Sequence, residues 1–405
     1  MANYNYYSDY LIIGSGIIGL TIAYALKEKI PTASINIIEK EDDVAQHSSG
    51  RNSGVLHSGF YYSEHSLKAK FTKDGNRLMQ EYCAKHNLKI NKCGKVVVAK
   101  NKKDHKALLE LEKRGKANQI EVTLIDDVQL KKIEPNAKTY QHALFSPTTA
   151  SIDPIEICQA IKRDLLSKGV NFFFNNAYFK RQNEDNVIIT NKNLSFCSKK
   201  IINCAGLYAD KVAADFGHSQ HYTIIPFKGI YLKYSKSDMP IKMNIYPVPN
   251  LKNPFLGVHY TITADKTIKI GPTAIPAFWR ENYQGFKNFN FKELRVILLN
   301  EILLFIFNSF NFRSLVFEEV KKYNRFYFIS LAKKLVHKID GRGFDHWSTP
   351  GIRAQLMDTR TRELVQDFVV ESDATSVHIL NAVSPAFTCS FAFSRWVVDN
   401  YIVIE

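Results

Sequence analysis

Three glycines near the N-terminus carry the first chemical signal in the chain. Gly14, Gly16 and Gly19 have the spacing G-x-G-x-x-G and follow directly on the apolar run 9–13. Glycines in this pattern permit a tight turn, let the backbone approach a pyrophosphate, and let a helix pack closely on a sheet. The free N–H groups at the start of that helix attract phosphates. The pattern predicts a dinucleotide site whose other members are Ser15, Ile17 and Ile18.

An acidic residue after the next apolar run narrows the choice of nucleotide. Residues 34–38 indicate a strand, and Glu39 follows it, 20 residues beyond Gly19. A carboxylate at this point accepts hydrogen bonds from a ribose diol and repels a 2′-phosphate, which favours FAD or NAD over NADP. We expect Lys40, the next residue, to lie at the same site. A glycine-rich turn without a ligand is the alternative, but the ordered series of strand, glycines, helix, strand and acid argues against it.

A later apolar strand favours FAD over NAD. Residues 199–203 are followed by Cys204, Ala205 and Gly206, small residues beside which a cofactor can lie close to the backbone. In nicotinamide-dependent dehydrogenases the nucleotide domain is usually contiguous. Here other segments separate its elements, as in large flavoproteins. FAD is therefore the expected cofactor.

Composition places these motifs in an ordinary globular chain. A length of 405 residues predicts two or three domains. No apolar run reaches the ~18–20 residues that cross a bilayer, which excludes a multi-span membrane protein. The six cysteines form no C-x-x-C pair, so we expect neither a metal site nor a disulfide framework. The N-terminus lacks the pattern of a signal peptide, and a cytoplasmic location is expected.

The chain is basic, with a net charge of +15. Its lysines and arginines are spread along the sequence, and no block of five basic residues occurs. A nucleic-acid partner is therefore not expected. A non-catalytic or nucleic-acid-binding flavoprotein stays a distant alternative, and its binding would weaken steeply with salt.

Further segments, in order along nearly the whole chain, carry a family resemblance. They are HSSGRNSGVLHSGFYY (47–62), SLKAKF (66–71), CGK (93–95), INCAGLYAD (202–210), IPFKGIYL (225–232), IYPVPNLKNPFLGVHYT (245–261), IKIGPTAIPAFWRENY (268–283), GIRAQL (351–356), DFV (367–369) and HILNAVSPAFTCS (378–390). Through these segments the sequence resembles the L-2-hydroxyglutarate dehydrogenase/oxidase family. That family consists of FAD enzymes of the D-amino-acid-oxidase and glycerol-3-phosphate-dehydrogenase superfamily.

The resemblance implies a fold and a domain order. The fold is α/β, with a Rossmann-like FAD-binding domain interleaved with a mainly antiparallel-sheet substrate domain of the D-amino-acid-oxidase type. The FAD-binding domain would take 1–82, 147–220 and 343–405, and the substrate domain 83–146 and 221–342. Local patterns also predict a helix that Asp153-Pro154 caps and Gly169 ends, and a strand at 187–190.

Two more loops would touch the cofactor, as the resemblance implies. The first runs along the flavin and contains many hydrogen-bond donors, with Arg51 suited to pair with the pyrophosphate; its members are Ser48, Ser49, Arg51, Asn52, Ser53, Gly54 and Val55. The second would place backbone amides at the pyrimidine end of the flavin, where they stabilise the reduced anion; its members are Ser384, Pro385, Ala386, Phe387 and Thr388.

The implied reaction oxidises a secondary alcohol next to a carboxylate. L-2-hydroxyglutarate would lose a hydride from C2 to the flavin N5 atom and become 2-oxoglutarate, while a base accepts the hydroxyl proton. A base with a pKa near neutral is favoured, so His57 and His259 are the candidates, and the choice between them stays open. Lys228 and Arg353 are the candidate partners for the anionic substrate, and an ordinary ion pair is the alternative.

Departures from the family's usual sequence leave the substrate open. Arg51 stands where a histidine is usual, Lys228 replaces an arginine, and 381–390 reads NAVSPAFTCS in place of N-A-P-S-P-A-A-T-S-S. Glycerol-3-phosphate or an amino acid is the alternative substrate in the same fold. An amine would favour a pocket acid near the flavin, and the acids nearest the motifs, Glu64 and Asp265, do not indicate one.

The most apolar stretch of the chain, 296–307, has two interpretations. The first is a substrate-domain helix that faces the core. The second is an interfacial anchor over 296–317, flanked by Arg295, Arg313, Lys321 and Lys322, on the inner face of a membrane. The anchor would suit an enzyme that passes electrons to a membrane quinone, with oxygen as the other acceptor.

Overall fold

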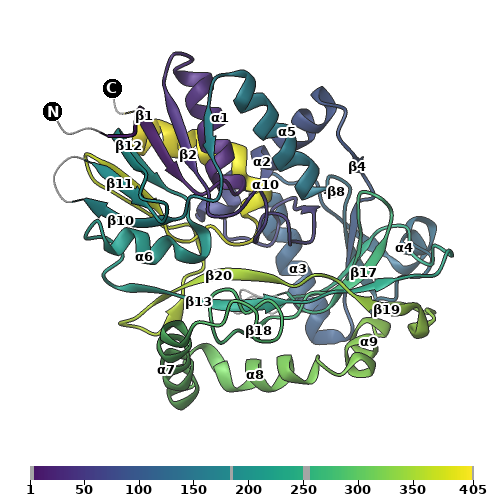
Figure 1. The fold of residues 1–405 in the computed structure, drawn as a ribbon. Coiled ribbons are helices and arrows are strands. Elements are labelled where there is room, and N and C mark those ends of the chain that lie inside the picture. Colours follow the sequence, from purple (N-terminus) through teal and green to yellow (C-terminus); the bar gives the residue numbers. More distant parts are fainter. Residues whose placement is uncertain (1–3, 183–185, 250–255, 404–405) are drawn as a thin grey trace.

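The computed structural model describes residues 4–182, 186–249 and 256–403. A mixed sheet, whose central strands are parallel, lies with its helices beside a mainly antiparallel sheet, and both ends of the described chain are at the first sheet (Figure 1). This arrangement confirms the expected α/β class. Residues 250–255, part of the matched segment 245–261, lie outside the described residues.

The nucleotide-binding sheet is built around its N-terminal strand. In spatial order its strands are β10 (Tyr178–Gln182), β11 (Val187–Thr190), β12 (Ser195–Asn203), β1 (Tyr6–Ile13), β2 (Ile35–Ile38) and β9 (Asn171–Phe173), with β23 (Ser376–Ile379) beside β12 and β22 (Val370–Ser372) beside β23. Strand β1 is parallel to both β2 and β12. Their carboxyl ends therefore meet at one edge, where the glycine loop and Cys204 follow.

Both faces of this sheet are covered, which explains its continuous apolar strands. Ile12 packs into the core beneath four helices, whereas its neighbours Leu11 and Ile13 pack against Val212 and Phe216 on the opposite face. The four helices are α1 (Ile17–Lys29), α2 (Leu67–Lys85), α5 (Pro154–Ser167) and α10 (Ala386–Val397), and the short α6 (Ala209–Ala214) lies on the other side. The sheet is thus a rigid base for the loops at its carboxyl edge.

The expected helix caps and strands of this domain are present. Asp153 precedes α5 and its carboxylate accepts hydrogen bonds from Ile155 N and Glu156 N, at 2.9 and 3.2 Å. Gly169 follows the helix with φ +75°. Strand β11 has the predicted bounds 187–190.

The substrate-domain sheet is antiparallel at every pairing except β5 with β15. In spatial order its strands are β19 (Phe344–Trp347), β14 (Leu232–Tyr234), β17 (Ile268–Gly271), β16 (His259–Ile262), β15 (Asn244–Pro247), β5 (Lys95–Val98), β7 (His142–Ser146) and β6 (Thr123–Asp126). The helices beside it are α3 (Lys102–Ala117), α4 (Asp127–Ile133) and α9 (Arg325–Lys333). Strands β5, β15 and β16 are neighbours, which becomes important for the site.

The described residues also form two small sheets. One contains β3 (Val55–Leu56), β8 (Ala150–Ile152) and β4 (Ile90–Asn91); the other contains β18 (Ile275–Pro276), β13 (Tyr222–Gly229), β20 (Gly351–Asp358) and β21 (Glu363–Leu364). The expected domain change at 342/343 does not coincide with a sheet boundary. Strand β19 pairs with β14, because chain 344–347 extends the antiparallel sheet before β20 turns toward the cofactor loops.

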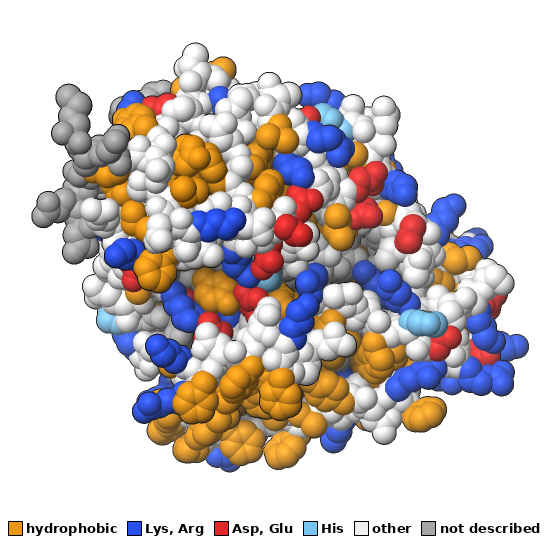
Figure 2. Space-filling model, viewed as in Figure 1, with side chains coloured by type: hydrophobic (Ala, Val, Ile, Leu, Met, Phe, Trp, Pro, Cys, Tyr) orange, Lys and Arg blue, Asp and Glu red, His pale blue; other side chains and the backbone are white. Residues whose placement is uncertain are grey.

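The apolar stretch 296–307 lies in helix α7 (Phe291–Phe307), which α8 (Phe312–Lys321) follows. Leu304 of α7 and Leu315 of α8 pack against Phe227 of β13. The opposite side carries an exposed set of large apolar residues, here called the outer apolar face: Val296, Leu299, Ile302, Ile306, Phe307 and Phe317. Figure 2 shows it as a continuous hydrophobic area below the domain junction. Within the described ranges no helix is long and apolar enough to span a bilayer.

Candidate active site

A cavity of about 950 Å³ runs from the glycine loop to the junction of the two domains. Its volume lies at the upper end of the range for cofactor and small-molecule sites. The three predicted loops all line it. The lining residues that were predicted for the cofactor are Gly14, Gly16, Ile17, Ile18, Glu39, Lys40, Ser48, Ser49, Arg51, Asn52, Ser53, Val55, Cys204, Ala205, Gly206, Ser384, Pro385, Ala386, Phe387 and Thr388.

Close backbone contacts explain the glycines and test whether a dinucleotide fits. A Cβ on Gly14, which has φ +101°, would lie 2.6 Å from the Cys204 carbonyl oxygen. A Cβ on Gly19 would lie 2.0 Å from the Gly14 carbonyl oxygen. Any side chain here would push β1, β12 and α1 apart. The start of α1 therefore opens into the cavity through bare backbone, which is the cradle that an FAD pyrophosphate requires.

Glu39 is held in place for a ribose. Its Oε2 accepts hydrogen bonds from Ser15 N and Ser15 Oγ at 2.8 and 2.9 Å, and its Oε1 accepts one from Glu41 N at 3.0 Å. Ser15 itself is fully buried and does not line the cavity. Its contribution is thus to orient the carboxylate. With these donors fixed, Glu39 presents its remaining acceptor capacity to the cavity.

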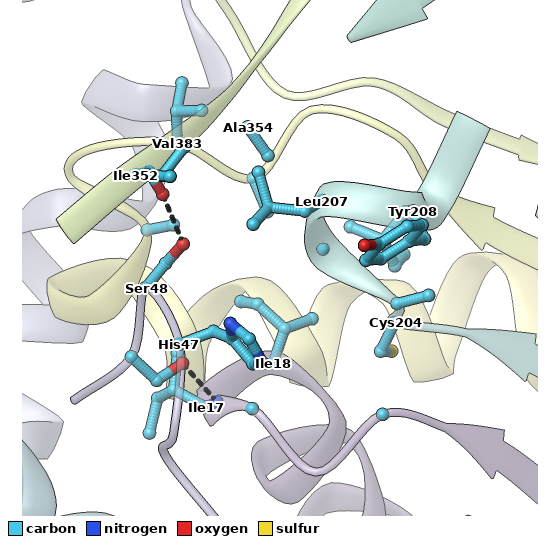
Figure 3. A pocket seen from close by; sticks show the side chains of 18 of the residues that line it. Ile17, Ile18, His47, Ser48, Cys204, Leu207, Tyr208, Ile352, Ala354 and Val383 are labelled. Carbon is cyan, nitrogen blue, oxygen red and sulfur yellow. Dashed lines mark hydrogen bonds between the residues drawn. The ribbon is translucent and has the colours of Figure 1, made fainter. Parts of the chain in front are cut away.

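The first flavin loop is attached to both neighbouring elements. Ser49 Oγ accepts a hydrogen bond from Ile17 N at 2.9 Å, and Ser48 Oγ donates one to the Ile352 carbonyl at 2.7 Å (Figure 3). The loop therefore connects the start of α1 with β20. Of its predicted members only Gly54 does not line the cavity, because it packs against the Ile152 carbonyl.

The basic residues predicted for this end are engaged with protein groups. Lys40 Nζ lies 2.6 Å from Glu41 Oε1 and 2.5 Å from Glu281 Oε1. With His47, these two carboxylates are close enough to hold a metal ion, but the Lys40 ammonium already lies between them. Arg51 lies over the Tyr283 ring at 4.2 Å. Its contact with the pyrophosphate stays a prediction.

His57 lies at the other end of the cavity with its backbone fixed. His57 N donates to Thr388 Oγ1 at 3.1 Å, and its carbonyl accepts from Asn76 Nδ2 at 3.0 Å. Helices α10 and α2 therefore hold the backbone of His57 in place. Burial lowers its pKa well below 6.5, and the nearby Lys95 and His259 lower it further. The imidazole is consequently neutral at pH 7, and its Nδ1 has no partner among the described residues, so it can accept a proton.

Arg353 supplies a cation to the same region. It lies on β20, lines the cavity, and donates from Nη1 to the Thr273 carbonyl at 3.0 Å. A Cβ on Gly229 would lie 3.3 Å from Nη1, so this glycine leaves room for the guanidinium. Tyr231 lines the cavity nearby, and its phenol pKa is raised by burial.

Two predicted catalytic residues do not line the cavity. His259 lies behind it, where its ring stacks on Tyr246 with centroids 3.7 Å apart and its Nδ1 is 2.7 Å from the Gly257 carbonyl. Burial lowers its pKa to about 3. Lys228 directs its Nζ to Asn282 Oδ1 at 3.3 Å, so the geometry gives no support to a substrate contact. Of the two histidines, only His57 lines the cavity.

Several lining residues were missed in the sequence. They are Gly229, Tyr231, Gly351, Ile352, Leu207, Tyr208, Val383 and the run 176–179. Two features of the sequence could have identified some of them: most of these residues fall inside the segments that carry the family resemblance, and two are glycines. A Cβ on Gly351 would lie 2.2 Å from the Arg51 carbonyl oxygen. The apolar residues carried no distinguishing sign, since residue type alone does not separate cavity walls from core.

The family assignment follows from the sequence as well as the site. The profile of the FAD dependent oxidoreductase family (DAO) matches residues 9–400. The chain belongs to this family, FAD is its cofactor, and it is an enzyme that oxidises its substrate.

Its similarity to L-2-hydroxyglutarate dehydrogenases confirms the expected resemblance. The chain is 35% identical over 394 residues to the L-2-hydroxyglutarate dehydrogenase of Indibacter alkaliphilus, covering 96% of this chain and 97% of the relative. It is 34% identical over 413 residues to the mitochondrial enzyme of Homo sapiens, covering 97% and 88%. The Escherichia coli enzyme is 30% identical over 395 residues, with 97% and 92% covered.

Solved structures share the fold at lower identity. The dithionite-reduced, FAD-bound L-α-glycerophosphate oxidase of Mycoplasma pneumoniae has a TM-score of 0.76 and 22% identity, covering 97% of this chain and 94% of that one. The glycine oxidase of Geobacillus kaustophilus has a TM-score of 0.71 and 14% identity, covering 98% and 95%. These enzymes act on different substrates, so the fold alone does not select one.

Proposed function

We propose that this enzyme oxidises L-2-hydroxyglutarate to 2-oxoglutarate. The observation that carries the proposal is a neutral histidine and an arginine, His57 and Arg353, in the cavity that also contains the FAD motifs. The names of the relatives support the same substrate. When bound, FAD supplies the two-electron acceptor, whose N5 atom takes the hydride from C2.

The side chains divide the remaining work. Arg353 binds the carboxylate next to the alcohol, because a guanidinium matches a carboxylate in two hydrogen bonds. His57 Nδ1 accepts the hydroxyl proton as the C2–H bond breaks. The alcohol is thereby converted into a ketone, and the imidazole becomes positively charged. Thr388 and Asn76 keep His57 in position. 2-Oxoglutarate then leaves, and the imidazole releases that proton to solvent.

The cavity favours a hydroxy acid over an amino acid. An amine would bring a positive charge that needs a carboxylate beside the reacting carbon. Among the described lining residues the only carboxylates are Glu39 and Asp215, and both belong to the nucleotide part of the site, after β2 and α6. Glycerol-3-phosphate is the remaining alternative, since its phosphate would also bind Arg353.

An anaerobic visible spectrum tests the proposal directly. The purified holoenzyme is mixed with L-2-hydroxyglutarate, and we expect prompt bleaching of the flavin bands. D-2-hydroxyglutarate, glycerol-3-phosphate and L-glutamate are the comparison substrates. Bleaching by one of these, with no response to L-2-hydroxyglutarate, would reject the substrate and keep the fold and cofactor.

We further propose that the electrons pass to a membrane quinone while the enzyme rests on the inner face of the membrane. The outer apolar face supports this: Phe307 is 57% exposed and Phe317 is 60% exposed. Lys292, Arg295 and Lys321 are exposed around it, which suits anionic lipid. Three of the expected flanking cations also have structural partners within the chain. Arg313 donates to the Phe305 and Ile306 carbonyls, Lys321 pairs with Glu318 at 3.1 Å, and Lys322 pairs with Glu319.

Vesicle flotation tests this contact. We expect the enzyme to float with vesicles of phosphatidylcholine and phosphatidylglycerol. The Ile306→Ser, Phe317→Ser double variant should remain in the bottom fraction. Leu166→Ser, which removes a half-exposed leucine from α5, is the matched control and should float normally. Equal flotation of all three proteins would reject this surface. A dimer that the double variant dissociates would show that a second copy covers the face instead.

A further inference from the structure

Lys95 is a fully buried lysine that the catalytic scheme leaves without a role. It ends the CGK motif and begins β5, and its side chain is 0% exposed. Its Nζ has no hydrogen-bond partner among the described residues. A buried ammonium without an anion is costly, so such groups normally lie beside a carboxylate or bind a ligand.

Aromatic rings enclose this ammonium in place of an acid. Nζ lies 4.7 Å from the ring centroids of both Phe60 and Tyr61, and 5.0 Å from that of Tyr246. Ring faces stabilise a cation in part, by ~2 kcal/mol or more when desolvated. They supply no hydrogen-bond acceptor for its three N–H groups. The rings therefore hold Lys95 in one place while they leave its donors available.

The same position is next to the reacting end of the cavity. Lys95, Tyr246 and His259 lie on the neighbouring strands β5, β15 and β16, and the His259 ring stacks on Tyr246. The charge of Lys95 lowers the pKa of His57, so the ammonium is close to the ring that lines the cavity. Tyr61 Oη and His57 Nδ1 also lack partners among the residues described. Lys95 Nζ and Tyr61 Oη lie behind the lining residues and are two buried donors that lack an acceptor, while His57 Nδ1 serves the hydroxyl group of the substrate.

We propose that Lys95 binds the distal carboxylate of the substrate and makes the site selective for dicarboxylates. The inference rests on the proposed function, in which Arg353 binds the carboxylate next to the alcohol. The distal carboxylate supplies the anion that Lys95 lacks, and Tyr61 can donate a second hydrogen bond to it. A substrate with a methyl group at that end would leave the ammonium buried and unpaired.

Ligand binding tests the inference without turnover. The holoenzyme is titrated with 2-oxoglutarate and with 2-oxopentanoate, which has a methyl group in place of the distal carboxylate, and the flavin spectrum reports binding. We expect wild type to prefer 2-oxoglutarate by about 100-fold, because a site built for a charged group rejects an analogue without it. In Lys95→Met that preference should fall to less than about threefold. An unchanged preference in Lys95→Met would overturn the inference.

Lys68→Met is the matched control. Lys68 is also a buried lysine near an aromatic ring, that of Tyr62 at 6.0 Å, but the carboxylate of Asp367 is near it. This variant should keep the preference for 2-oxoglutarate. If it lost the preference to the same extent, the effect of Lys95→Met would be general damage to packing, and the inference would fail.

Wild type alone gives a second test if Lys95→Met does not fold. In the enzyme without a bound ligand, burial lowers the pKa of Lys95 to about 7. The groups that face it are His57, His259, Tyr61, Tyr246 and Cys93; the histidine pKa values lie lower and the phenol and thiol pKa values higher. Affinity for 2-oxoglutarate should therefore fall about tenfold per pH unit above pH 7, and that for 2-oxopentanoate should not. Parallel pH profiles would overturn the inference.

The outcomes separate the two proposals. If wild type prefers the dicarboxylate but L-2-hydroxyglutarate does not bleach the flavin, the proposed reaction is wrong and the role of Lys95 stands. If L-2-hydroxyglutarate bleaches the flavin and wild type shows no preference between the two ligands, the reaction stands and Lys95 has no such role.

Discussion

The two ends of the cavity are built in different ways. At the nucleotide end, contacts within the chain fix the loops in place: Glu39 accepts from three donors, and a Cβ on Gly14 or Gly19 would clash with a neighbouring carbonyl. At the substrate end, His57 Nδ1 and Lys95 Nζ are buried with no partner among the described residues. The nucleotide end therefore has its shape before the ligand binds, whereas the substrate end has buried polar groups that lack a partner until the ligand binds.

This difference follows from what each ligand demands. FAD is a permanent cofactor, so a rigid cradle of backbone lowers the entropy lost on binding. A substrate must bind, react and leave many times. Buried polar groups that a substrate satisfies cost the free enzyme about 1–3 kcal/mol each. That cost is recovered when the matching substrate binds, which is how such groups provide selectivity.

The largest effect is expected at the nucleotide end. Gly14→Asp should abolish FAD binding, because a Cβ would lie 2.6 Å from the Cys204 carbonyl in a backbone conformation with φ +101°. Flavin absorbance per mole of folded protein measures this. Gly217→Ala is the control: its φ is +82°, but a Cβ there meets nothing within 4 Å. Normal flavin content in a folded Gly14→Asp variant would remove the basis for a rigid cradle.

Removal of the base should be the next largest effect. His57→Ala should slow anaerobic flavin reduction by about 10²–10⁴-fold, the usual contribution of general-base catalysis. Its flavin content should stay normal, because His57 is held by α2 and α10 and belongs to the substrate end. Stopped-flow absorbance with saturating L-2-hydroxyglutarate measures the rate. A loss of less than fivefold would transfer the role of base to another group.

A smaller effect is expected for the carboxylate partner. Arg353→Lys keeps the charge but loses the planar pair of donors, so KM should rise about 10–100-fold with a lesser change in kcat. Steady-state kinetics separates the two constants. Should kcat fall while KM stays the same, Arg353 would act on the transition state alone and the proposed ground-state contact would be wrong.

The smallest effect concerns pH. Burial lowers the pKa of His57 well below its usual value of 6.5, so the ring stays neutral at pH 6 as well as at pH 7. We therefore expect kcat/KM not to fall between pH 7 and pH 6. With an ordinary pKa of 6.5 the neutral fraction would drop about threefold over this interval. Since only the neutral imidazole accepts a proton, a threefold loss of kcat/KM would show that the ring is solvated. The substrate end would then resemble an open surface rather than a buried site.

The glycine loop and Glu39 were predictable because their sequence signals are local, whereas the loops 48–55 and 384–388 were predicted through the family resemblance. Strand β1, the glycines and Glu39 lie within one short segment, and close packing fixes their types. The exceptions are instructive: Ser15 was predicted at the cofactor, but it turns inward and orients Glu39. A polar residue between two glycines indicates a nucleotide-binding loop. It does not show which way its own side chain points, because that direction depends on the tertiary structure.

The substrate end was predictable only in part. His57 and Arg353 were identified and line the cavity, whereas His259 and Lys228 were identified on the same grounds and do not. Charge and motif membership cannot show which way a strand residue points. Lys95 belongs to the CGK segment, but the sequence indicates no role for it. A lysine is expected to be exposed to solvent unless its neighbours in the fold are known.

The sequence by itself determined the cofactor and the glycine loop, because these depend on neighbouring residues and on glycines that close packing requires. The α/β class and the other cofactor loops followed from the family resemblance of the sequence. Only the tertiary structure decided which histidine faces the cavity and which is stacked on Tyr246. It alone showed that Lys95 is enclosed by rings from β15 and the 55–62 loop. Burial and electrostatic environment come from strands distant in the sequence, and a linear pattern does not record them.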